Sequence, residues 1–321
     1  MRQLLAAGVG TIVGIVLALL GFGVWSLVFS NLLGNMAGVL LLWRTCDWRP
    51  SWSFSLTSLR KLFRFGGLMA LSSLMGTVYT NLQSLIIGKR YSAADLGYYT
   101  QAQKLENVPV QTISTVISQV TFPLFSEMQD EKDRLRFAVR KNIQMTCYLV
   151  FPLMAMLAVI ARPLIVLLYG AKWEPAVPFF QLLCLWGMIN PLNALNVNVS
   201  KSLGRSDIFF FSHLLMRVLG IILIVLASRR GVFGLLVVVV ALEYIFLLVY
   251  WLINKRLIGY GMVEQIRDIG LYYVFAIALA FFVYWAGGLL HVHPYVRMLL
   301  QIVVYGGIFI LLSHLLRLEG Y

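Results

Sequence analysis

The chain has 321 residues, of which 60% are hydrophobic and 12% are charged. This composition excludes an ordinary soluble domain and predicts a polytopic membrane protein. The formal net charge of +13 does not indicate a nucleic-acid partner, because Lys and Arg in such a protein set its topology and face anionic lipid.

Apolar runs long enough to cross about 30 Å of hydrocarbon recur along the whole chain. The first run could be the core of a signal peptide after Arg2, but no small-x-small cleavage site follows it and a second span comes next. We therefore expect an all-α, polytopic membrane helix bundle of about ten transmembrane helices. They are predicted at residues 4–21, 23–43, 60–88, 92–127, 133–168, 174–203, 206–228, 231–254, 266–289 and 294–317.

The clearest boundary lies at residues 44–59, where the apolar pattern breaks. The following heptapeptide, LRKLFRF, is basic and amphipathic and is typical of a segment lying on a membrane surface. We interpret 44–59 as a cytoplasmic linker between a bundle of two helices and one of eight. Loops on the linker's side carry most of the Lys and Arg residues, so we expect both termini in the cytoplasm.

The stretch KLENVPVQTISTVISQ, residues 104–119, places polar side chains along one face of a predicted helix. In hydrocarbon such a face has to look into protein or a water-filled cavity. Glu106 lies off this stripe. The lysine could instead snorkel to the outer interface. The stripe consists of Lys104, Asn107, Gln111, Ser114, Thr115 and Ser118, within about 100° of arc.

Two neighbouring helices repeat the pattern, which predicts a shared hydrophilic interior. The alternative for the Ser and Thr positions is helix packing. Arg217 could line the cavity or snorkel, and Glu243 could pair with a base or carry a coupling proton. The neighbouring stripes are Ser73, Thr77, Thr80, Asn81 and Ser84, with Gln83 nearby, and Asn190, Asn193, Asn196, Ser200 and Lys201.

Motifs for catalysis or metal binding are absent from the sequence. The four histidines are scattered, and Cys46, Cys147 and Cys184 lie far apart. No glycine-rich phosphate loop or nucleophile motif occurs. We therefore expect no cofactor, no metal and no catalytic residue, and we expect that the protein is not an enzyme.

Three blocks carry a resemblance to a known family. They are TNLQSLIIGKRYSAADLGYYTQAQKLENVPVQ at 80–111, TFPLFSEMQDEKDRLR at 121–136 and LYGAKWEPAVPFFQLLCLWGMI at 168–189. In order and spacing they resemble the polysaccharide exporter, or O-antigen flippase, family. More narrowly, they resemble the lipopolysaccharide and colanic acid exporter branch of the multidrug, oligosaccharidyl-lipid and polysaccharide exporter superfamily.

The resemblance implies a bilobed inner-membrane transporter that flips undecaprenyl-pyrophosphate-linked oligosaccharide by alternating access, for lipopolysaccharide or surface polysaccharide biosynthesis. Family members have fourteen helices, and this chain is expected to begin at the fifth. Residues 1–43 would then be a remnant of the first lobe, 44–59 the linker, 60–255 the second lobe, and 256–321 two C-terminal helices. Many relatives carry an acidic residue where Gln83 stands and a basic or polar one where Lys104 stands.

The expected partners are the lipid-linked oligosaccharide, membrane lipid and a coupling ion, either a proton or sodium. Amides suit sugar hydroxyls, and a lysine suits a diphosphate. A multispan O-antigen polymerase or ligase is the alternative, which a sizeable outer loop with arginines or histidines would favour, and an inactive transporter fragment is another. The candidate cavity residues are Lys104, Asn107, Gln111, Asn81, Gln83, Asn190, Asn193 and Arg217.

Overall fold

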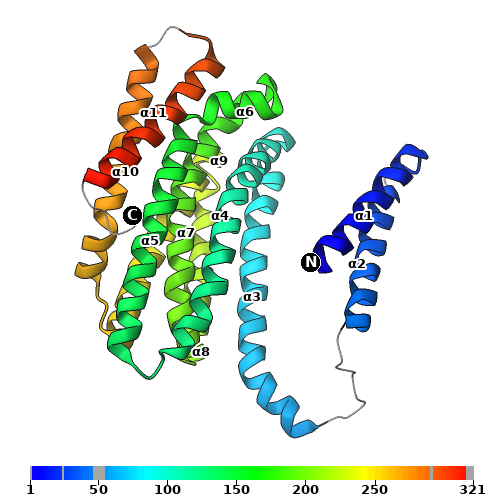
Figure 1. The fold of residues 1–321 in the computed structure, drawn as a ribbon, viewed down its shortest axis with the longest axis vertical. Helices are drawn as coiled ribbons and strands as arrows, with labels where there is room; N and C mark the ends of the chain where they lie inside the picture. The colour runs from blue at the N-terminus through cyan, green and yellow to red at the C-terminus, as the bar shows by residue number, and fades with distance from the viewer. Residues whose placement is uncertain (1, 24, 46–54, 290–291, 316–321) are drawn as a thin grey trace. The chain divides into compact units, whose positions relative to one another are not determined.

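The computed structural model describes residues 2–23, 25–45, 55–289 and 292–315, and these residues form helices and turns without a β-strand (Figure 1). The expected all-α fold is therefore confirmed. The described chain divides into two compact units, Met1–Arg60 and Lys61–Tyr321. Most of the linker predicted at 44–59 lies outside the described residues, as do Cys46 and His291.

The first unit is a helical hairpin of α1 (Arg2–Leu19) and α2 (Trp25–Thr45). The two helices approach closely where Gly10 faces Ser30. A Cβ atom at Gly10 would lie 2.8 Å from the carbonyl oxygen of Ser30, and the Ser30 Oγ donates a 2.7 Å hydrogen bond to the Gly10 carbonyl. Small residues thus allow backbone contact between neighbouring membrane helices.

The second unit contains most of α3 (Leu56–Arg90) and all later helices. Their arrangement in Figure 1 places α7 at the centre of the bundle, where it packs against α4, α5 and α9. An apolar core runs through these contacts. The later elements are α4 (Ala93–Glu127), α5 (Lys132–Val159), α6 (Ala161–Tyr169), the 3-10 helix η1 (Ala171–Ala176), α7 (Val177–Ser202), α8 (Ser206–Ala227), α9 (Gly231–Ile258), α10 (Met262–Leu289) and α11 (Pro294–Leu315).

The single helix predicted at 133–168 is wrong, because the chain breaks at Ile160 into α5 and α6. Pro163 explains the break: it has no N–H to donate to the carbonyl of Val159, and its ring clashes with that carbonyl in a continuous helix. In the first turn of a new helix the same proline is tolerated. Gly170 then turns the chain with a φ of 91°, which favours glycine, so α7 begins at Val177.

Seven helices of the described chain are long and apolar enough to cross a membrane: α2, α5, α7 with η1, and α8 to α11. This pattern confirms the polytopic helix bundle. Of the ten predicted spans, the other three are α1, whose described apolar stretch is short, and α3 and α4. Helices α3 and α4 carry polar stripes, which lower their mean hydropathy.

Hydrogen bonds hold the amino end of α4 and the carboxyl ends of α3 and α8. Ser92 caps α4, because its Oγ accepts a 3.0 Å hydrogen bond from the Asp95 N–H while the Asp95 carboxylate accepts one from the Ser92 N–H. Arg90 Nη1 donates a 2.9 Å hydrogen bond to Ser228 Oγ, and the Tyr91 hydroxyl donates to the Ser228 carbonyl. The carboxyl ends of α3 and α8 are therefore joined.

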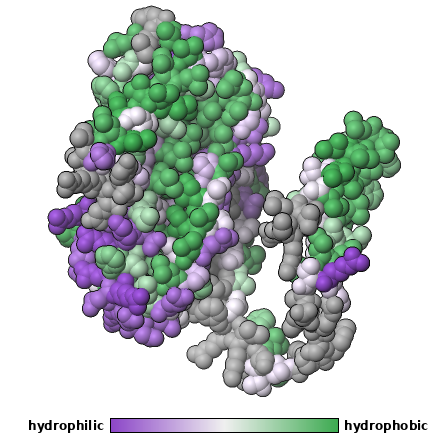
Figure 2. All heavy atoms as spheres, viewed as in Figure 1, coloured by the Kyte–Doolittle hydropathy of each residue, from purple (hydrophilic) through white to green (hydrophobic). Residues whose placement is uncertain are grey.

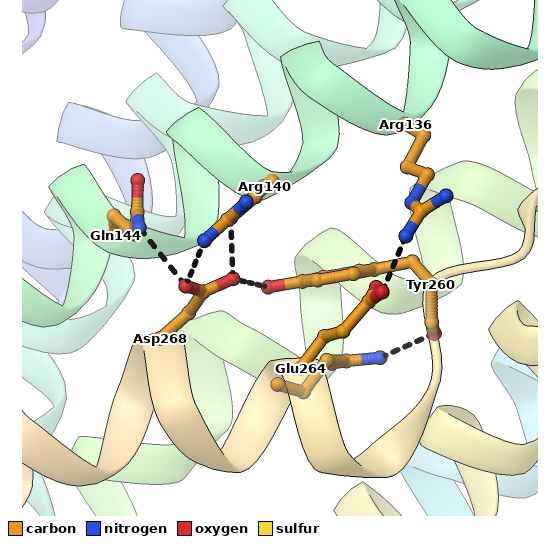
Figure 3. A network of polar contacts seen from close by, with 7 residues as sticks. Arg136, Arg140, Gln144, Tyr260, Glu264 and Asp268 are labelled. Carbon is orange, nitrogen blue, oxygen red and sulfur yellow. Dashed lines mark hydrogen bonds and ion pairs between the residues drawn. The ribbon is translucent and has the colours of Figure 1, made fainter.

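A buried carboxylate joins α10 to α5 (Figure 3). Asp268 accepts hydrogen bonds from both Arg140 Nε and Nη2 at 2.7 Å, and one from Gln144 Nε2 at 3.2 Å. The Tyr260 hydroxyl donates to the same carboxylate at 2.8 Å. Burial and the bond to Asp268 raise the pKa of the Tyr260 phenol, so it stays protonated and remains a donor.

The face of the second unit that is seen in Figure 2 has a hydrophilic lower end and an apolar body. Figure 2 shows hydrophilic residues gathered at the lower end, around the turn between α4 and α5, with hydrophobic residues over much of the remaining face. Exposed large side chains such as Leu149, Leu215 and Phe281 are typical of a surface that meets lipid. An apolar outer surface therefore encloses the polar interior of the second unit.

Candidate functional site

Two neighbouring cavities lie inside the second unit between α3, α4, α7, α8 and α9. We call the first, of about 410 Å³, the Glu106 cavity, and the second, of about 350 Å³, the Lys201 cavity. Both are lined by Asn190, Arg217 and Glu243. Because these residues belong to both linings, the cavities form one polar region inside an apolar bundle.

Most of the predicted cavity residues meet in this region. Asn190 and Arg217 line both cavities, and Asn193 lines the Lys201 cavity. Four more of the predicted residues line the region from α3 and α4. These are Asn81, Gln83, Asn107 and Gln111, which line the Glu106 cavity.

The stripe on α4 continues beyond these residues into an adjoining groove of about 530 Å³. Gln111 also lines the groove, as do Ser118 and Lys201, so the groove meets both cavities. The α4 side of the groove also includes Ser114, Thr115, Gln119 and Phe122. The polar face predicted from the sequence is therefore directed into hollow regions along most of its length.

Lys104 is the exception, because it is exposed and lines none of these hollows in the described chain. The inward face of α4 changes along the helix. Before Pro109 it is formed by Tyr99, Gln103, Glu106 and Asn107, and after it by Gln111 and the residues that follow. The prediction treats the stripe as one straight face across Pro109, whereas the inward face shifts around the helix there and leaves Lys104 outside.

Glu106 is the side chain that the sequence reading left out. It is 0% exposed, and neither carboxyl oxygen has a hydrogen-bond partner among the described residues. Gly187 makes room for it: a Cβ atom there would lie 2.6 Å from Glu106 Oε1. A buried acid without a donor is costly, so such groups are candidates for function. The sequence signal was an acid beside a predicted polar face.

Glu243 has a defined partner. Asn193 Nδ2 donates a 2.9 Å hydrogen bond to Glu243 Oε2, and both side chains are buried. An amide of the predicted α7 stripe thus holds the acid of α9. Asn196, from the same stripe, accepts a 2.5 Å bond from Asn254 and joins α7 to α9, which is a packing role.

Hydrogen bonds join several of the side chains that line the Glu106 cavity. Gln103 Nε2 donates to the Tyr99 hydroxyl at 2.9 Å, and that hydroxyl donates to Gln83 Oε1 at 3.1 Å. The Arg217 guanidinium stacks 4.3 Å from the ring centroid of Tyr79, which also lines the cavity. The cavity walls are therefore positioned by contacts between α3, α4 and α8.

The described residues contain no group of three or more His, Cys, Asp or Glu side chains placed to hold a metal ion. Cys147 and Cys184 are free and buried. What the region offers chemically is amide and hydroxyl hydrogen bonding, two cations and two carboxyl groups. Fold and site together define a polytopic membrane protein with a polar interior.

Comparison with known proteins places this arrangement in a family. The model for the family described as "Polysaccharide biosynthesis protein" matches residues 1–178, which is more than half of the chain, and the chain belongs to this family. The expected family is confirmed.

Several curated relatives have names that specify export or biosynthesis of polysaccharides. The succinoglycan biosynthesis transport protein ExoT of Rhizobium meliloti is 27% identical over 210 residues, covering 65% of this chain and 42% of that protein. The teichuronic acid biosynthesis protein TuaB of Bacillus subtilis is 28% identical, covering 57% and 38%. The lipopolysaccharide biosynthesis protein WzxC of Escherichia coli is 30% identical, covering 56% and 36%. This chain therefore spans about two fifths of the length of these relatives.

Among solved structures, the lipid II flippase MurJ in an inward closed conformation is similar to this chain, with a TM-score of 0.76. The match covers 98% of this chain and 67% of that chain at 13% sequence identity. At that identity the likeness shows the fold. The expectation that the chain forms part of a flippase fold is thereby confirmed.

Proposed function

We propose that this chain takes part in flipping a lipid-linked oligosaccharide across a bacterial inner membrane, for synthesis of lipopolysaccharide or another surface polysaccharide. The observation that carries the proposal is the polar region of the two cavities, enclosed by helices whose outer surface is apolar. A polar interior of this kind is needed where a hydrophilic solute has to pass through hydrocarbon.

The chemistry of the cavity walls fits such a substrate. Amides such as Asn190, Gln83 and Asn107 can exchange hydrogen bonds with sugar hydroxyls, and cations can meet a diphosphate. We propose undecaprenyl pyrophosphate as the carrier, with its polyprenyl tail remaining in lipid. The names of ExoT and MurJ, a transport protein and a flippase, support transport over a polymerase or ligase activity.

The transport cycle that we propose is alternating access, in which residues 60–255 rock as one lobe against another around a shared site. Both termini would face the cytoplasm. A coupling ion, proton or sodium, would act through Glu106 and Glu243, the carboxyl groups that line the Glu106 cavity. Because the chain spans about two fifths of its relatives, we assign it one lobe's share of this activity and not the whole.

Complementation tests the proposal. An exporter-deletion strain that makes the matching glycan would receive either this chain or a chimera in which the amino-terminal part of WzxC precedes it. We expect surface glycan to return with the chimera and not with the chain alone, because alternating access needs two lobes. In the chimera, Asn190→Leu should reduce export severalfold, whereas Leu149→Ala on the exposed surface should not. Failure of a membrane-inserted chimera with every matching glycan would refute the proposal.

A further inference from the structure

Three nitrogen-bearing side chains converge on the Lys201 cavity from two helices. Lys201 stands at the end of α7, and His213 and Arg217 follow each other by one turn on α8. The spacing of His213 and Arg217 places them on one face of α8, whereas the position of Lys201 beside them depends on the packing of α7 against α8. The cavity also carries the amides of Asn190 and Asn198.

The two cations of this cavity rest on aromatic rings and not on carboxylates. Lys201 Nζ lies 4.7 Å from the ring centroid of Phe209, and the Arg217 guanidinium lies 4.3 Å from that of Tyr79. Among the ion pairs of the described residues, neither cation takes part. A ring face holds a cation while leaving its N–H donors free for another acceptor.

The acid in the same cavity, Glu243, attracts the charge of Arg217 and also has a hydrogen-bond partner of its own. Glu243 Oε2 accepts its hydrogen bond from Asn193 at 2.9 Å. The His213 ring packs against Phe209 at 4.4 Å between centroids, and its Nε2 atom is buried without a partner in the described part of the chain. The cavity therefore offers two cations, a further nitrogen and several amides, against one carboxyl group.

We propose that the Lys201 cavity is the oxyanion subsite of the protein and binds the diphosphate of the lipid-linked substrate, with Lys201 and Arg217 as its charged ligands. This inference rests on the proposed function. Cations within a low-dielectric protein need counter-ions, and a diphosphate supplies charge together with many acceptor oxygens. A volume of about 350 Å³ lies within the usual range of ligand pockets. The assignment moves the diphosphate contact from Lys104, where the sequence placed it, to Lys201 and Arg217.

The test uses the whole chain, purified in nanodiscs of neutral lipid, with inorganic pyrophosphate as the probe and calorimetry as the readout. We expect saturable binding that weakens about tenfold or more in Lys201→Gln and in Arg217→Gln. Lys172→Gln is the matched control, because Lys172 also lies over a ring, that of Trp173, but lines none of the cavities described above. It should bind pyrophosphate as the parent chain does. Lys201→Arg and Arg217→Lys should recover most of the affinity if charge is the recognised property.

Two further measurements complete the test. One compares a sugar carboxylate with pyrophosphate as the bound anion, and the other distinguishes failure of the subsite from failure of the proposed function. Sodium glucuronate, a sugar carboxylate, should bind at least tenfold more weakly than pyrophosphate, and equal binding would overturn the diphosphate assignment. Loss of affinity in Lys172→Gln equal to that in Lys201→Gln would show nonspecific charge and would also overturn it. If the chimera with WzxC exports glycan while Lys201→Gln and Arg217→Gln leave both pyrophosphate binding and export intact, the subsite is wrong and the proposed function stands.

Discussion

The Asp268 network predicts a large difference between two neighbouring ion pairs (Figure 3). Asp268 is 3% exposed and Arg140 is 47% exposed, whereas Arg136 and Glu264 are 38% and 44% exposed. Removing one member of a buried pair costs about 3–5 kcal/mol. Because water can resolvate the half-exposed Arg140, we expect Asp268→Asn to lower the free energy of unfolding by about 2–3 kcal/mol.

Glu264→Gln provides the matched comparison, since it removes one carboxylate charge from the same helix. Both members of the Arg136–Glu264 pair are accessible to water, so the expected cost is below about 1 kcal/mol. Unfolding would be followed by tryptophan fluorescence during titration of mixed micelles with sodium dodecyl sulfate. The double variant of Asp268→Asn with Tyr260→Phe should lose less than the sum of the single losses, because both remove the same 2.8 Å hydrogen bond. Equal costs for the Asp268 and Glu264 variants would refute the argument from burial.

Three other outcomes follow from the second unit. Gly187→Ala should destabilise the chain by about 1–3 kcal/mol in the same titration, since its Cβ would meet Glu106 Oε1 and Met154 Cε at 2.6 Å; an unchanged midpoint would show that α4 and α7 yield at no cost. Glu106→Gln should raise that midpoint at neutral pH, because it removes an ionisable group that has no donor, and a lower midpoint would reveal a hidden partner. Single cysteines at Ser92 and Arg134 should react with an impermeant thiol reagent from outside and inside respectively, since they lie beyond opposite ends of α4, a helix about 50 Å long; labelling from one side would overturn the proposed topology.

Much of the fold could be predicted because periodicity and length carry it. The polar stripes identified α3, α4 and α7 as helices around the cavities, and Asn190 of α7 lines both cavities. The division at Ile160 is harder to predict, although Pro163 signals it, because the apolar run continues through the proline and is long enough for a single helix.

The candidate site was harder to predict because it depends on contacts between helices. A helical wheel locates a polar face but does not say which neighbour covers it. Glu106 is buried because Gly187 of α7 leaves space for its carboxyl group, and no local signal near residue 106 encodes that space. Lys201 and His213 meet because α7 and α8 pack together, which their separation in sequence does not reveal.

The tie between Ser228 and the end of α3 limits how the protein can open. Arg90 and Tyr91 fasten the carboxyl end of α3 to that of α8, while Ser73 and His213, which face the Lys201 cavity, lie several turns away on the same two helices. A rod that is pinned at one end moves most at the other. We therefore expect α3 and α8 to separate by rotation about their joined ends at Ser228. The Lys201 cavity would then widen while the Ser228 end stays closed.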